Sequence, residues 1–113
     1  MLFRSLAINE EIGDRNGEAS CYGILGALLL PLGEHVKAKQ YLEKGLEMKK
    51  ELGERSGEAL CCGTLADAFN FLGEYSKATE YLEKALSIRK EIGDKNGEAT
   101  DYGNLGNVFQ FPF

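Results

Sequence analysis

The chain has 113 residues and a formal net charge of −5, from 13 basic and 18 acidic residues. This length fits one domain. The acidic balance argues against nucleic acid, which is bound by a basic surface, and against an anionic membrane surface. The longest apolar run, at residues 24–32, is far shorter than the roughly 20 residues needed to span a bilayer. We therefore expect a cytoplasmic protein without nucleic-acid or membrane partners.

A short segment returns twice along the chain. EIGDRNG at residues 11–17 reappears as ELGERSG at 51–57 and as EIGDKNG at 91–97, each time 40 residues later. A fixed period of this size is typical of a solenoid built from repeated helical units. The whole chain is then one array. It divides into the end of a preceding repeat at 1–12, full repeats at 13–52 and 53–92, and the first helix of a truncated repeat at 93–110.

Two helices are predicted in each repeat. The first follows an N-cap residue at Asn16, Ser56 or Asn96, whose side-chain oxygen can accept a free backbone N–H. It ends near Gly33 or Gly73, where the left-handed conformation that glycine permits allows a tight turn. The expected helices lie near residues 1–12, 16–31, 34–52, 56–71, 74–92 and 96–110.

The apolar residues follow helical spacing in both helices of a repeat. In the first helix they are Tyr22, Leu25, Leu29 and Leu32, then Leu65, Phe69 and Leu72. In the second helix they are Ala38, Tyr41, Leu42, Gly45 and Leu46, then Ala78, Tyr81, Leu82, Ala85 and Leu86. Each set forms one stripe that can be buried against a neighbouring helix. The fold class is therefore all-α, a right-handed α-solenoid of antiparallel helix pairs.

Small residues recur inside the first helix. Gly26, Ala66 and Gly106 share one repeat position, where we expect the paired helix to approach closely. A glycine inside a helix costs roughly 1 kcal/mol relative to alanine, so its recurrence favours such a packing role.

The pattern resembles the tetratricopeptide repeat. The matching residues are Tyr22, Leu25, Gly26, Leu29, Ala38, Leu42 and Gly45, then Cys62, Leu65, Ala66, Phe69, Ala78, Leu82 and Ala85, then Tyr102, Leu105, Gly106 and Phe109. The 40-residue unit is similar to the repeats of the LGN/Pins spindle-orientation adaptors and of large multi-repeat scaffolds. The resemblance implies a non-enzymatic adaptor or scaffold that binds a protein or peptide partner in a concave groove.

The first helices of the repeats would line this groove. The positions expected to face it are Ser20, Ile24, Ala27 and Leu30, then Leu60, Thr64, Asp67, Asn70 and Phe71, then Thr100, Asn104, Asn107 and Gln110. In the LGN-like family the asparagines of the GNLGN phrase bind the backbone of a peptide. Asn104 and Asn107 match that phrase, so the resemblance implies peptide contacts there; a solvated polar helix face is the alternative.

No catalytic or metal-binding pattern stands out. Cys21, Cys61 and Cys62 lack a CxxC pair, and His35 is the one histidine, so we expect neither a metal nor a cofactor. The cysteines are expected to be buried small hydrophobes in a reducing compartment, and His35 to be a surface residue. Arg15, Arg55 and Lys95 each follow an acid, which predicts solvated loop pairs or contact with an acidic ligand.

Two further interpretations stay open. Phe109, Phe111 and Phe113 would normally meet a partner helix, and Pro112 prevents continuation of the helix. The chain could therefore form a homo-oligomer through this face, or be a structural fragment of a longer array. In the other interpretation it belongs to an enzyme or signalling protein whose active domain is absent.

Overall fold

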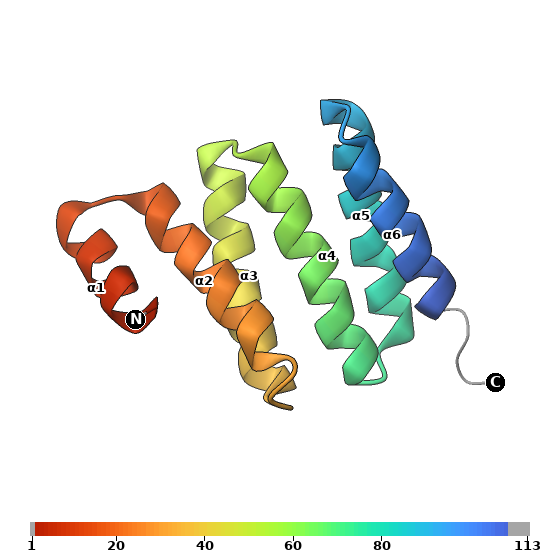
Figure 1. The fold of residues 1–113 in the computed structure, drawn as a ribbon, viewed down its shortest axis with the longest axis horizontal. Helices are drawn as coiled ribbons and strands as arrows, with labels where there is room; N and C mark the ends of the chain where they lie inside the picture. The colour runs from red at the N-terminus through yellow and green to blue at the C-terminus, as the bar shows by residue number, and fades with distance from the viewer. Residues whose placement is uncertain (1, 109–113) are drawn as a thin grey trace.

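The computed structural model describes residues 2–108, without the side chains of residues 2, 9, 11 and 12. This part of the chain contains six helices: α1 (Leu2–Ile12), α2 (Arg15–Leu29), α3 (His35–Leu52), α4 (Arg55–Phe71), α5 (Tyr75–Ile92) and α6 (Lys95–Val108). Each helix packs against the next in the chain. The arrangement confirms the predicted all-α solenoid of helix pairs (Figure 1).

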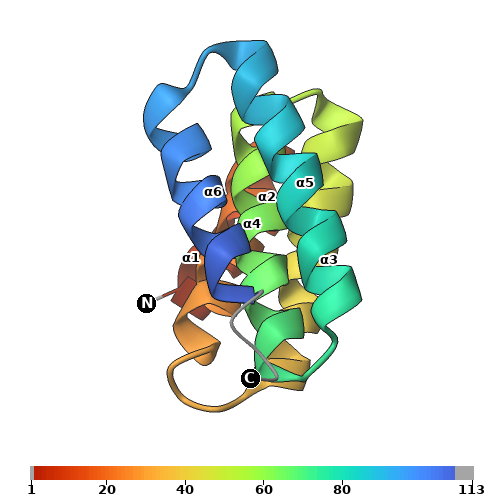
Figure 2. The ribbon, with the colours of Figure 1, turned by 90° about the vertical axis from the view of Figure 1, so that its right-hand side faces the viewer.

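The helices lie in two layers. Figure 2 shows α2, α4 and α6 on one side of the molecule and α3 and α5 on the other. The contacts within the pairs α2–α3 and α4–α5 are the most extensive, followed by those between α3 and α4. The first helices of successive repeats therefore share one face.

Glycine ends the helices where the sequence predicts. Gly33 and Gly73 have φ values of 80° and 79°, and Gly53 and Gly93 have φ values of 68° and 74°. At Gly53 the next amide, that of Glu54, donates to the carbonyl of Lys49 at 3.0 Å, which closes the end of α3. A side chain is strained at such φ values, so glycine is required in these turns.

The predicted N-caps are two residues too late. Helix α2 begins at Arg15, and its N-cap is Asp14, whose carboxylate accepts from the Gly17 amide at 2.9 Å. Asp94 accepts from the Gly97 amide in the same way. Glu54 is the N-cap of α4 but makes no side-chain cap bond. The acidic caps therefore precede the helices, and Asn16, Ser56 and Asn96 lie inside the first turn.

The core follows the predicted stripes. One cluster of buried residues includes Leu42, Leu65, Phe69 and Leu82 and joins helices α2 to α6. Gly26 packs against Leu42, and a Cβ there would press on the leucine side chain, whereas Gly106 meets nothing within 4 Å. Leu32 does not join the stripe as predicted, because it lies in the exposed turn after α2.

Arg15 and Arg55, two of the recurring basic residues, form ion pairs within their own repeats. Arg15 binds Glu51 at 2.9 Å, and Arg55 binds both Glu58, at 2.8 Å, and Glu91. The predicted partners Asp14 and Glu54 do not take part, because an arginine at the start of one helix reaches the end of the following helix. These exposed pairs add little stability.

Candidate functional site

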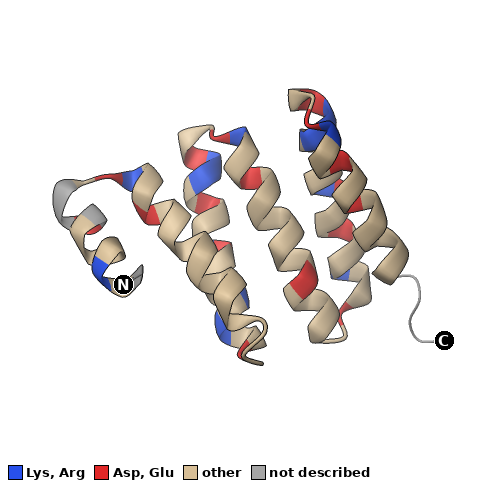
Figure 3. Cartoon of the chain, in the orientation of Figure 1, with Lys and Arg blue, Asp and Glu red and all other residues tan. Residues whose placement is uncertain are grey.

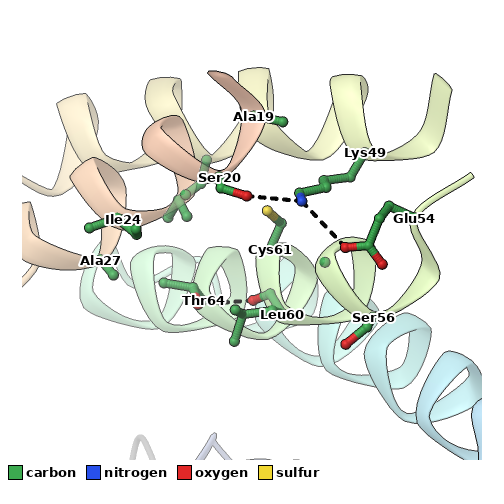
Figure 4. A pocket seen from close by; sticks show the side chains of 13 residues that line it. Ala19, Ser20, Ile24, Ala27, Lys49, Glu54, Ser56, Leu60, Cys61 and Thr64 are labelled. Carbon is green, nitrogen blue, oxygen red and sulfur yellow. Dashed lines mark hydrogen bonds and ion pairs between the residues drawn. The ribbon is translucent and has the colours of Figure 1, made fainter. Parts of the chain in front are cut away.

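A pocket of about 380 Å³ opens between α2 and α4, on the face formed by the first helices. Of the residues predicted to face a groove, Ser20, Ile24, Ala27, Leu60 and Thr64 line it. Figure 4 shows α2 on one side of the pocket and α4 on the other. Ile24 and Leu60 are 48% and 61% exposed, so two large apolar side chains are accessible at its mouth.

A buried lysine forms the polar end of this pocket. Lys49 is 5% exposed, and its Nζ donates to Asn16 Oδ1 at 2.6 Å. It also donates to Ser20 Oγ at 3.0 Å and Glu54 Oε2 at 3.4 Å (Figure 4). An ammonium group has three protons, and all three are engaged. Lys49 therefore links α2, α3 and the start of α4, and its charge is compensated by Glu54.

Glycine makes room for this buried cation. A Cβ on Gly57 would lie 2.6 Å from Cδ of Lys49, and one on Gly97 would crowd Arg89, the repeat equivalent of Lys49. Lys49 was not predicted as a site residue. The signal was present, because a cation at 49 and 89 recurs eight residues before a glycine at 57 and 97.

Cys61 lines the pocket as well. Burial raises the pKa of its thiol, and the charge of Lys49 opposes that shift only in part. Burial likewise raises the pKa of Cys62 to about 11. Both thiols therefore stay protonated at neutral pH. A protonated thiol is much less reactive than a thiolate. All three cysteines are buried, as predicted.

The space between α4 and α6 has a polar cluster that differs from the one around Lys49 between α2 and α4. Arg89 binds Asp94 at 2.6 Å, and its Nε lies 3.7 Å from Oδ2 of Asp101, which is 2% exposed. Burial raises the pKa of Asp101, and Arg89 opposes the shift. Arg89 and Asp101 occupy the repeat positions of Lys49 and Cys61. The space between α4 and α6 thus has a buried ion pair where the space between α2 and α4 has an ammonium and a thiol.

Asp67 is the acidic residue of α4 beyond its first turn. It is half-buried and lies one turn after Thr64, on the helix face that carries Leu60. Among the described residues, no ion pair or hydrogen bond joins its carboxylate. Burial raises its pKa, and the charge of Asp101 adds to the shift. Ionisation of Asp67 therefore costs more in the folded chain than in the unfolded one.

Replacing Asp67 by asparagine should stabilise the chain. At pH 7 we expect Tm to rise by roughly 2–5 °C, because the amide avoids the cost of a half-buried charge without a counter-ion. A folded-state pKa above the unfolded value means that protonation favours the fold. The gain should therefore vanish as pH falls through the raised pKa of Asp67, where the native side chain is also neutral. Thermal unfolding followed by circular dichroism at several pH values measures this, and an unchanged or lower Tm at pH 7 contradicts it.

The other predicted groove residues are dispersed along α4 and α6. Thr100 is exposed, and its hydroxyl donates to the carbonyl of Asn96 at 3.0 Å. Asn104 is half-buried and Asn107 exposed. Asn70 is half-buried, and its Oδ1 is buried without a hydrogen-bond partner in the described part of the chain. Binding of a peptide by these residues stays a prediction.

Two groove predictions differ from the structure. Leu30 is buried in the core cluster rather than facing the groove, because the chain turns inward after α2 ends at Leu29. Phe71 is 61% exposed but does not line the pocket; its ring stacks on His35 at 4.6 Å between centroids. His35 is accordingly half-buried, not the plain surface residue that the sequence predicts.

The remaining predicted residues lie at the end of the chain. Gln110, Phe109, Phe111 and Phe113 are outside the described residues, so self-association through the phenylalanines stays a prediction. On α6 itself, Tyr102 is exposed, whereas its repeat equivalents Tyr22 and Cys62 are buried.

Two searches of the described residues bear on other classes of site. Within residues 2–108, no group of three or more His, Cys, Asp or Glu side chains is arranged to hold a metal ion. No helix in this part of the chain is both long and apolar enough to cross a membrane.

The helix pairs form two layers, and a pocket lies between α2 and α4. This architecture defines a helical repeat protein of the solenoid class. A family model of the tetratricopeptide repeat matches residues 19–52 and 59–92, more than half of the chain. The chain belongs to the tetratricopeptide repeat family. Repeats of this family generally serve as protein–protein interaction modules. A search of curated proteins finds no match.

Proposed function

We propose that the chain is a non-enzymatic adaptor or scaffold module that binds a peptide segment of a partner protein along α2, α4 and α6. The observation that carries this proposal is the pocket between α2 and α4, with Ile24 and Leu60 accessible at its mouth. Accessible apolar side chains around a concave site favour ligand binding, because covering them removes apolar surface from water. Cys61 and Cys62 are buried and form no disulfide, which supports a location in the reducing cytoplasm.

The peptide backbone also needs hydrogen-bond partners when it leaves water. Asn104 and Asn107 lie on α6 and are half-buried and exposed, respectively, so their amides are available to donate and accept. We assign them this role, which is the point of likeness to the LGN/Pins-like adaptors.

A matched pair of surface substitutions tests the proposal. Leu60→Arg places a charge at the mouth of the pocket, and Val36→Arg places the same charge on α3, away from the pocket lining. Both native side chains are exposed, so each change should alter stability by no more than about 0.5 kcal/mol. Partners captured from a lysate and identified by mass spectrometry should be kept by Val36→Arg and lost by Leu60→Arg. Equal capture by both variants contradicts binding in the groove.

A further inference from the structure

The groove face has an uneven distribution of charge. Beyond the first turn, helices α2, α4 and α6 carry two charged residues, Asp67 and Asp101, and both are acidic. Figure 3 shows the lysine and arginine residues of these helices gathered at their upper ends, with tan and red below. The charged residues beyond the first turns of α2, α4 and α6 are therefore both acidic.

The carboxylates of Asp67 and Asp101 differ in whether the protein supplies a counter-ion. Asp101 is buried beside Arg89, so it is already paired inside the protein. Asp67 is half-buried and has no counter-ion among the described residues. Lys49 cannot supply one, because its three protons bind Asn16, Ser20 and Glu54. A carboxylate in this setting is stabilised by a cation brought from outside.

We infer that the partner segment carries an apolar side chain, which enters the pocket between Ile24 and Leu60, and a lysine or arginine side chain, which pairs with Asp67. This inference rests on the proposed function and adds the chemistry of its ligand. The raised pKa of Asp67 supports it, because a cation beside the carboxylate would offset the cost that burial adds to its ionisation.

The geometry of α4 also sets the spacing of the two side chains. Leu60 and Asp67 are seven residues apart on one helix face, which is about 10 Å at 1.5 Å per residue. An extended peptide covers about 10 Å in three residues. We therefore expect the basic residue about three positions from the apolar one.

Selection from a phage-displayed library of linear peptides, each about 12 residues long, tests this ligand chemistry. The bait is the full chain as the native protein, as Asp67→Asn and as Glu83→Gln. Glu83 is exposed on α5, outside the groove, so its variant removes one negative charge as a control. The native chain and Glu83→Gln should enrich peptides with an apolar residue and a lysine or arginine about three positions away. Asp67→Asn should keep the apolar preference and lose the basic one.

A synthetic peptide from this selection should bind Asp67→Asn about tenfold more weakly than the native chain, the effect of one charge-assisted contact. Because Asp67→Asn is expected to be at least as stable as the native chain, unfolding does not account for such a loss. Selected peptides without a basic preference, or a preference that survives in Asp67→Asn, would overturn the inference and leave the proposed function intact. A selection that enriches no peptide overturns the proposed function as well.

Discussion

Phe69→Ala is expected to lower the free energy of unfolding by about 3–5 kcal/mol. Phe69 is 2% exposed and lies in the cluster that joins both full repeats. Its ring stacks on Tyr81 at 5.3 Å between centroids, and Lys39 and Lys77 lie over it. Alanine would remove these contacts and leave a cavity. Because a small domain has roughly 5–15 kcal/mol of stability in total, the variant should be largely unfolded at temperatures where the native chain is folded.

Phe71→Ala is the matched control for this substitution. Phe71 is two residues away and 61% exposed, with the His35 ring as its stacking partner. We expect a loss of at most about 1 kcal/mol there. Urea unfolding followed by circular dichroism compares the two variants with the native chain. Similar losses at both positions would mean that the cluster around Phe69 does not hold the repeats together.

Lys49→Ala is expected to destabilise the chain by about 2–4 kcal/mol, because it removes the common donor of three oxygens and leaves a cavity beneath the pocket. Asn16, Ser20 and Glu54 would lose their contacts with Lys49 at once, and the connection between α2 and the start of α4 would go with them. Glu54 is half-buried, so water can solvate its carboxylate in the variant. The expected loss of unfolding free energy is therefore smaller than for a fully buried charge without a counter-ion.

Lys50→Ala provides the control for Lys49→Ala, because Lys50 is the next residue on α3 and is exposed. Its replacement should change the free energy of unfolding by no more than about 0.5 kcal/mol. The same urea titration measures both. If Lys49→Ala proved as harmless as Lys50→Ala, the ammonium would not be a structural link, and its charge would be free for a ligand.

The fold was predictable because its determinants are local and repeated. The 40-residue period gives the pairing of the helices, and Gly33, Gly53, Gly73 and Gly93 mark their ends. The buried stripes follow from helical spacing alone. Leu30 and Leu32 were misplaced because they lie in the turn after α2, where helical periodicity no longer determines which side chain is buried.

The helix starts and the polar end of the pocket were harder to predict. Asp14 and Asn16 are both good capping residues, and spacing alone does not choose between them. In the structure Asp14 caps α2, and Asn16 lies inside the first turn and binds Lys49. Lys49 itself lies among other lysines and glutamates on α3, and only the space left by Gly57 allows its burial. That space is a property of two neighbouring helices and not of either segment alone.

The central claim is that the face formed by α2, α4 and α6 binds a peptide. The most direct measurement is a two-dimensional NMR titration of the isotope-labelled chain with a peptide selected from the library. We predict chemical-shift changes centred on Ile24, Leu60 and Asp67, with the exposed residues of α3 and α5 unchanged. Shift changes centred on α3 and α5, with Ile24 and Leu60 unaffected, would contradict the claim and place the binding surface on the opposite layer.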